Sequence, residues 1–225
     1  MKQIKTNYGQ YINANFFDLP IAPHSISTLI TDIPYLDYTK AIRNGNGNLS
    51  EWTEFVVSMS KKFNEICNEN ANVLIFTGMW GESIVLKYME PFFDLKQKLI
   101  WEITNPRPID MLQNHRMKNM LNVIEPISWF VRGKDYYFND AYIRKFQNGR
   151  LLNVIKCGRS SNSPYSSKPL MLIELLVQTF TDPNKVVLDP FAGVGTLGRV
   201  CDKADINWVC VEKNEKTFNE GAKNF

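Results

Sequence analysis

The stretch Leu188-Asp-Pro-Phe-Ala-Gly193-Val-Gly195-Thr-Leu-Gly198 determines the fold that the sequence predicts. The apolar residues from Val186 to Leu188 are typical of a short buried strand, and a helix is expected from about Thr196. The three glycines stand at the GxGxxG spacing, which lets a turn between a strand and a helix approach a nucleotide closely. The spacing alone does not identify the ligand, so the residues around it must decide.

Two features argue against a dinucleotide, namely the carboxylate of Asp189 and the small number of residues that follow Glu212. Asp189 stands at the strand end, where its charge would repel a pyrophosphate but suit an ammonium group such as that of S-adenosylmethionine. Glu212 ends the next apolar strand, Trp208-Val-Cys-Val211, where a carboxylate can accept both hydroxyls of an adenosine ribose. Only 13 residues follow Glu212, so the remaining strands are expected from the N-terminal half, in a permuted order.

The rest of the chain alternates between strand and helix patterns. Helical spacing runs from Glu51 to about Asn68, with Ser50 as N-cap, and again from Leu170 to Phe180. Further strands are expected at 27–31, 73–76, 99–101 and 127–131, and a further helix at 82–89. This alternation predicts an α/β fold, a Rossmann-like, mostly parallel sheet with helices on both faces. The 225 residues suit one such domain over 1–225.

The middle of the chain has a different charge. Between Lys96 and Arg159 there are 12 basic and 5 acidic residues, whereas the whole chain carries a net charge of only +3. The segment 105–159 is irregular, basic and aromatic, with one expected strand. It is therefore interpreted as a small basic insert that faces a polyanion, with a solvated loop region as the alternative.

Cysteine and histidine usage favours neither a metal site nor disulfides. The four cysteines form no CxxC pair and there are only two histidines, so no metal is expected. Cys201 and Cys210 lie in apolar surroundings, which indicates core thiols in a reducing compartment. No apolar run has the length of a membrane span or the form of a signal peptide, so we expect a cytoplasmic protein without membrane contact.

A second motif, Asp32-Ile-Pro-Tyr35, follows the strand at 27–31. Together with the glycine turn it resembles the Asp-Pro-Pro-Tyr signature of the β-class DNA amino-methyltransferases, in which this tetrapeptide comes first, target recognition second and the cofactor turn last. Ile12-Asn-Ala-Asn-Phe16, the segment 99–108, and Pro164-Tyr-Ser-Ser-Lys168-Pro169 are similar to further family segments. The resemblance covers nearly the whole chain. It departs from the family at Ile33, where a proline is usual, at Ser163, where a histidine is usual, and in one extra residue between Pro164 and Lys168.

The resemblance implies an activity and its residues. The chain is expected to adopt the S-adenosylmethionine-dependent methyltransferase fold and to methylate the exocyclic amino group of a base flipped out of double-stranded DNA. A homodimer is compatible with the resemblance. The implied catalytic residues are Asp32, Ile33 (through its carbonyl), Pro34 and Tyr35. The implied cofactor-binding residues are Asn15, Asp32, Lys168, Asp189, Phe191, Gly193, Gly195, Thr196 and Glu212. In the recognition insert at 105–159, phosphates would be held by Arg107, Arg116, Lys118, Arg132 and Lys134.

Four functions stay open at this point. Asp rather than Ser at the start of the tetrapeptide favours adenine N6 as the methylated atom, and cytosine N4 is the first alternative. A nicotinamide-dependent dehydrogenase is the second, and Asp189 together with the permuted order disfavours it. A catalytically inactive nucleic-acid binder is the third, because Ile33 lacks the fixed φ of proline.

Overall fold

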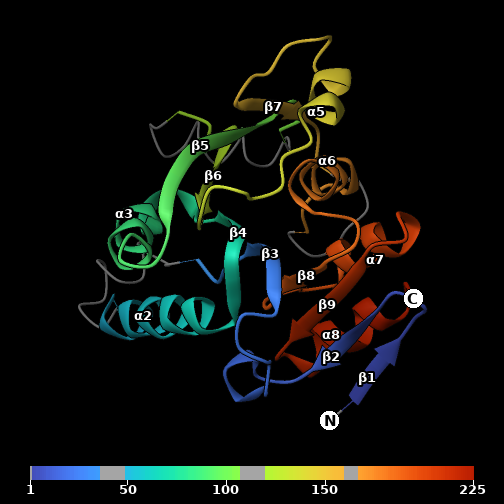
Figure 1. Cartoon of the computed structure of the whole chain (residues 1–225). Helices are drawn as coiled ribbons and strands as arrows, with labels where there is room; N and C mark the ends of the chain where they lie inside the picture. Colours follow the sequence, from blue (N-terminus) through green and yellow to red (C-terminus); the bar gives the residue numbers. More distant parts are fainter. Residues whose placement is uncertain (1, 36–48, 107–119, 160–166) are drawn as a thin grey trace.

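The structure, a computed structural model, describes residues 2–35, 49–106, 120–159 and 167–225. These residues form one nine-stranded sheet in the order β1-β2-β9-β8-β3-β4-β6-β5-β7 (Figure 1). Five of its eight pairings are parallel, and three are antiparallel. The strands are β1 (Lys2–Lys5), β2 (Gly9–Asn13), β3 (Ile26–Asp32), β4 (Cys67–Phe76), β5 (Asp94–Ile103), β6 (Ile124–Val131), β7 (Val154–Cys157), β8 (Val186–Asp189) and β9 (Asn207–Glu212).

Helices cover both faces of this sheet. The helices are η1 (Phe16–Asp18), α2 (Leu49–Ile66), α3 (Gly78–Met89), α5 (Asp140–Phe146), α6 (Leu170–Phe180), α7 (Thr196–Lys203) and α8 (Glu215–Ala222). Val56 of α2 and Val85 of α3 belong to one buried cluster, while Leu176 of α6 and Leu197 of α7 belong to another. Figure 1 accordingly shows α2 and α3 on one side of β3 and β4, and α6 and α7 on the other. Among the described residues, no helix combines the length and apolarity that crossing a bilayer requires.

The predicted permuted α/β fold is confirmed. β8 and β9, from the last 40 residues, lie between β2 and β3 of the N-terminal part. Val187 pairs with Thr28 of β3 and with Trp208 of β9, so the glycine-turn strand sits at the centre of a parallel block. Two strands and two helices were not anticipated, namely β1, β7, η1 and α5, each of which is short.

The middle of the chain corrects the predicted insert at 105–159. Its described part, 120–159, supplies β6 and β7 to the main sheet, and β6 lies between β4 and β5. Trp129 is buried, and its indole donates a hydrogen bond to Asn72 Oδ1 on β4 over 2.9 Å. The segment from β6 to β7 is therefore part of the scaffold. The remainder of the predicted insert, 107–119, lies outside the described residues.

Candidate active site

A cavity of about 980 Å³ lies at the carboxyl edge of the parallel strands. Asp32 ends β3, Asp189 ends the neighbouring β8, and both line this cavity. Thr31 Oγ1 donates a hydrogen bond to Asp189 Oδ1 over 2.7 Å, so the two strand ends are also tied together. The two carboxylates that the sequence predicts to converge, 157 positions apart in the chain, therefore face one space.

The predicted cofactor residues gather around this cavity with one exception. Those that line it are Asn15, Asp32, Lys168, Asp189, Phe191, Gly193, Thr196 and Glu212. Gly195 is not among the lining residues. It has a φ of +74°, and a Cβ there would lie 2.8 Å from the Phe225 ring. Gly195 therefore shapes the turn that precedes α7 and does not face the cavity.

Backbone groups of the glycine turn are held by side chains from neighbouring strands. Glu212 Oε2 accepts the Gly193 N–H over 3.0 Å, and Oε1 accepts the Asn214 N–H over 2.6 Å. The Tyr11 hydroxyl donates to the Gly193 carbonyl. Each Glu212 oxygen keeps a second lone pair, so the carboxylate can order the turn and still accept ligand hydroxyls.

Asp189 is the most strongly perturbed carboxylate of the site. Burial raises its pKa to about 7, although hydrogen bonds from Thr31 and from the Phe191 N–H oppose the shift. A buried carboxylate with a raised pKa lacks a cation, and a ligand ammonium would supply one. The residue thus fits the role that the sequence suggests for it.

Aromatic rings line the cavity beside the glycine turn. The Phe191 ring packs against Phe16, Phe17 and Phe55, with ring centroids 5.3–6.5 Å apart. All four rings line the cavity, as does Asn15, whose Nδ2 donates to Asp18. An apolar wall with one amide beside it is typical of a site for a purine ring.

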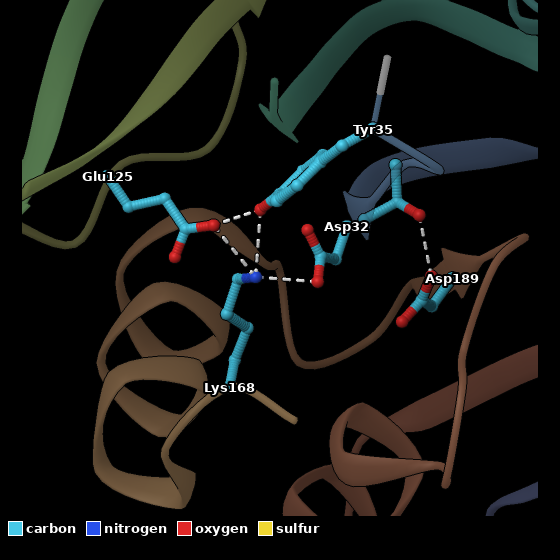
Figure 2. A network of polar contacts seen from close by, with 6 residues as sticks. Asp32, Tyr35, Glu125, Lys168 and Asp189 are labelled. Carbon is cyan, nitrogen blue, oxygen red and sulfur yellow. Dashed lines mark hydrogen bonds and ion pairs between the residues drawn. The ribbon is translucent and has the colours of Figure 1, made fainter. Parts of the chain in front are cut away.

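A buried ion-pair network occupies the opposite end of the cavity (Figure 2). The Lys168 ammonium donates to Asp32 Oδ2 over 2.6 Å, to Glu125 Oε1 over 3.0 Å and to the Tyr35 hydroxyl over 3.0 Å. The Tyr35 hydroxyl donates in turn to Glu125. Only 8% of the Lys168 side chain is exposed, so the ammonium depends on these oxygens for its solvation.

Asp32 has one oxygen engaged and one unpartnered. Oδ2 accepts from Lys168, whereas Oδ1 is buried and accepts no hydrogen bond from any residue that the structure describes. Burial raises the pKa of Asp32, and the Lys168 ammonium counteracts that shift. A buried acceptor at a cavity wall is costly without a donor, and a ligand N–H would satisfy it.

Packing holds Ile33 and the two residues that follow it in place. Its side chain is only 2% exposed and belongs to the cluster formed with α2 and α3. Trp52 of α2 donates its indole N–H to the Pro34 carbonyl over 2.8 Å, which fixes the segment after Ile33. The Tyr35 ring then lies against Gly78, where a Cβ would come within 3.2 Å of the ring. Packing thus replaces the rigidity that a proline would provide.

Two residues that were predicted to hold phosphates, Arg132 and Lys134, are not among the residues that line the cavity. β6 runs antiparallel to β4, so both residues follow its far end, at the amino edge of the sheet. The Arg132 guanidinium donates to the carbonyls of Asn64, Cys67 and Phe92 and to Asn64 Oδ1, which occupies all its nitrogens. Lys134 is exposed at the same edge, where the next residue donates to Asn70. The predicted phosphate contacts Arg107, Arg116 and Lys118 lie outside the described residues.

Glu125 is the site residue that the sequence did not reveal. It stands near the start of β6, opposite Trp101 of β5, and lines the cavity. The only local signal is a carboxylate beside an apolar run. Its meaning depends on β6 being antiparallel, because only then does the start of the strand reach the carboxyl edge of the parallel strands.

The fold and the cavity together define a class. Dinucleotide enzymes place a pyrophosphate over the glycine turn, whereas here the buried carboxylate of Asp189 lines the cavity directly before that turn. The site instead suits a cofactor with an ammonium group, a ribose and a purine, beside a second carboxylate for an acceptor substrate. These are the features of an S-adenosylmethionine-dependent methyltransferase.

Comparison with known proteins identifies the methyltransferase family to which the chain belongs. Residues 26–223 match the model of the N6/N4 methyltransferase family, described as DNA methylase, so the chain belongs to that family of DNA amino-methyltransferases. It is 24% identical over 208 residues to the type II methyltransferase M.HindIII of Haemophilus influenzae, covering 75% of this chain and 67% of that protein. It is 22% identical over 241 residues to M2.LlaDCHI of Lactococcus lactis subsp. cremoris, covering 94% and 87%.

Solved structures share the fold. The PvuII DNA methyltransferase, described as cytosine-N4-specific, superimposes with a TM-score of 0.81 at 20% identity, covering 98% of this chain and 87% of that one. M1.HpyAVI in complex with S-adenosylmethionine gives 0.73 at 24% identity, covering 96% and 100%. The family model thus places this protein among the DNA methylases, as the sequence motifs indicated, and the solved structures share its fold.

Proposed function

We propose that this protein methylates the N6 amino group of adenine in double-stranded DNA. The observation that carries the proposal is the buried Oδ1 of Asp32, which has no hydrogen-bond partner among the described residues and lies at the same cavity that Asp189 lines from the neighbouring strand. An exocyclic amino group has two N–H donors and needs two acceptors to react well. Asp rather than Ser at position 32 favours adenine, as in the family signature that the tetrapeptide resembles.

Each residue of the tetrapeptide has a separate role in this proposal. Asp32 Oδ1 accepts one N–H of the target amino group, and the Ile33 carbonyl accepts the other. These contacts favour a pyramidal nitrogen with a localised lone pair, and they stabilise the positive charge that develops on it. The Tyr35 ring stacks on the base. Asp32 then takes the amino proton, which becomes acidic as the new N–C bond forms.

In this proposal the cofactor binds at the part of the cavity lined by Asp189 and the glycine turn, and the target base binds beside Lys168. The cofactor supplies an electrophilic methyl group. Asp189 pairs with its ammonium, and Glu212 accepts the ribose hydroxyls. Asn15 and Phe191 contact the adenine ring, while Gly193 and Thr196 provide the floor. Lys168, which the sequence assigned to the cofactor, contacts Asp32 and Glu125, and we place it on the side of the target base.

The target base must leave the duplex to reach Asp32, so the proposal includes base flipping. The buried free cysteines and the bacterial origin of the relatives support the expected cytoplasmic location. A homodimer stays a prediction. Cytosine N4 is the competing target, and the similarity in fold to the cytosine-N4-specific PvuII enzyme favours keeping it in the test.

The test is transfer of a labelled methyl group to unmethylated duplex DNA, followed by mass spectrometry of the released nucleosides. We expect N6-methyladenine from the wild type and a loss of at least ~1000-fold for Asp32→Ala, with cofactor affinity retained. N4-methylcytosine would replace the adenine assignment. Cofactor binding without labelled DNA would favour the inactive DNA-binding relative, and full activity of the variant would remove the assigned role of Asp32.

A further inference from the structure

Glu125 brings a second carboxylate to the catalytic end of the cavity. It arises from β6, far from the tetrapeptide in sequence, and only 15% of its side chain is exposed. One of its oxygens, Oε1, accepts both from Lys168 over 3.0 Å and from the Tyr35 hydroxyl. Figure 2 shows the Lys168 nitrogen between Glu125 and Asp32, with the Tyr35 hydroxyl beside it.

The arrangement divides one cation between two carboxylates. A lone Lys168–Asp32 pair would concentrate the ammonium on Asp32, leave that carboxylate a weaker acceptor and compete with the incoming amino group. Glu125 draws part of the ammonium's hydrogen bonding away, since the Lys168 distances to the two carboxylates are 2.6 and 3.0 Å. The Asp32–Lys168–Glu125 group then carries a formal charge of −1, which suits a reaction that places positive charge on a neighbouring nitrogen.

Glu125 also controls the direction of the Tyr35 ring. The ring is 44% exposed and lies over Gly78, and its hydroxyl is held at the far end by Glu125 and Lys168. A ring that is held at both ends can keep an orientation parallel to the base without being buried.

We propose that Glu125 is a positioning residue of methyl transfer, which shares the Lys168 ammonium with Asp32 and holds the Tyr35 ring in its stacking orientation. This inference rests on the proposed roles of Asp32 and Tyr35. It does not depend on whether the base is adenine or cytosine.

The charges around Asp32 determine in which direction its pKa moves when one of them is removed. Asp32 is faced by Lys168 from the segment before α6, by Glu125 from β6, by Tyr35 from its own loop and by Asp189 from β8. Lys168 lowers the pKa of Asp32 and Glu125 raises it. Removing the Glu125 charge therefore keeps Asp32 ionised to lower pH, whereas removing the Lys168 charge does the opposite.

The experiment compares Glu125→Gln, Glu125→Ala and Lys168→Met by single-turnover methyl transfer to unmethylated duplex DNA of random sequence across pH. We expect Glu125→Gln to slow transfer by roughly 10-fold and Glu125→Ala by roughly 10–100-fold, as for loss of a charged hydrogen bond. The acidic limb of the rate profile should move to lower pH in both Glu125 variants and to higher pH in Lys168→Met. Cofactor affinity, measured by calorimetry, should equal that of the wild type in the Glu125 variants.

The matched control is Glu102→Gln on β5, which removes a partly exposed carboxylate paired with Lys156. It should leave the rate and the pH profile unchanged. If Glu125→Gln behaves like this control, or slows transfer without moving the acidic limb, the inference is overturned. Asp32→Ala in the same assay separates the two proposals: if that variant retains transfer, the proposed catalytic site fails, whatever Glu125 does.

Discussion

β8 and β6 belong to one sheet but deliver their functional residues from opposite ends. β8 is parallel to its neighbours, so its last residue, Asp189, reaches the cavity. β6 is antiparallel to β4, so its early residue Glu125 reaches the cavity and Arg132, just past its end, lies at the other edge. Glu125 and Arg132 are seven positions apart along the strand, which corresponds to roughly 20 Å. Strand direction, more than position in the sequence, therefore decides which charged residues can meet a ligand.

The largest effect that tests this contrast is expected at the amino edge. Arg132→Met removes the guanidinium that donates to the part-buried carbonyls of Asn64, Cys67 and Phe92. We expect the free energy of unfolding to fall by ~2–4 kcal/mol, measured by denaturant titration. DNA affinity of the folded variant should equal that of the wild type. A folded variant with normal stability and weaker DNA binding would restore Arg132 as a phosphate contact.

The next largest effect is expected on cofactor affinity when the charge of Asp189 is removed. Asp189→Asn keeps the acceptor for Thr31 and for the Phe191 N–H but removes the charge. We expect S-adenosylmethionine affinity at pH 8 to fall by ~100-fold in calorimetry. In the wild type, affinity should decline as pH is lowered through about 7, because protonated Asp189 cannot pair with the ammonium. The variant should lose this dependence, and an unchanged pH dependence would place the cofactor ammonium elsewhere.

The same raised pKa affects stability with the opposite sign. The unfolded carboxyl ionises near its ordinary pKa, whereas the folded one retains its proton up to about 7, so the ligand-free protein loses stability as pH rises between these values. At pH 8 Asp189→Asn should therefore be more stable than the ligand-free wild type, by ~1–3 kcal/mol. Thermal unfolding at pH 5 and pH 8 provides the measurement, and a variant less stable at pH 8 would contradict the assignment.

A smaller effect is expected at the glycine turn. Gly195→Ala places a Cβ at a φ of +74° and 2.8 Å from the Phe225 ring. The cost should be ~1–2 kcal/mol of stability, with weaker cofactor binding because the Gly193 segment shifts. Gly149→Ala is the control, since its φ of +83° is similar but nothing lies within 4 Å of the added Cβ. Equal losses in both variants would show that φ alone, and no contact at the turn, sets the cost.

The smallest effect completes the comparison at the amino edge. Lys134→Met alters an exposed residue beside Arg132 and should change stability by no more than ~0.5 kcal/mol. DNA affinity at low salt should also be unchanged. A reduced salt dependence of DNA binding in this variant would mean that DNA reaches the amino edge after all.

The sequence was sufficient where the position of a site residue follows from consecutive strand, turn and helix segments. Strand, turn and helix around Gly193 are consecutive, and a carboxylate at each strand end has a fixed direction once the strands are known to be parallel. Asp32, Asp189 and Glu212 therefore reach the cavity as expected. Ile33 was anticipated as a departure from the family, but its burial under α2 and the Trp52 bond to Pro34 arise from tertiary packing.

The sequence was insufficient where the position of a residue depends on how the strands pair. The run from Ile124 to Val131 is apolar enough to show a strand, but nothing in it shows which strands flank it or in which direction it runs. The surplus of Lys and Arg around it suggested an insert facing DNA. For Arg132 a scaffold role accounts for the charge instead, because its guanidinium is stacked 4.3 Å from the Phe93 ring and bonded to carbonyls.

The insertion of β8 and β9 between β2 and β3 has a consequence for synthesis on the ribosome. Until residues 186–212 emerge, β2 and β3 lack their central neighbours, and β3 presents an open edge to other nascent chains. A product that ends before residue 186 lacks Asp189, Glu212 and the two strands that join β2 to β3. Exposed strand edges of this kind favour aggregation, so release of such a product is expected to lead to aggregation or proteolysis.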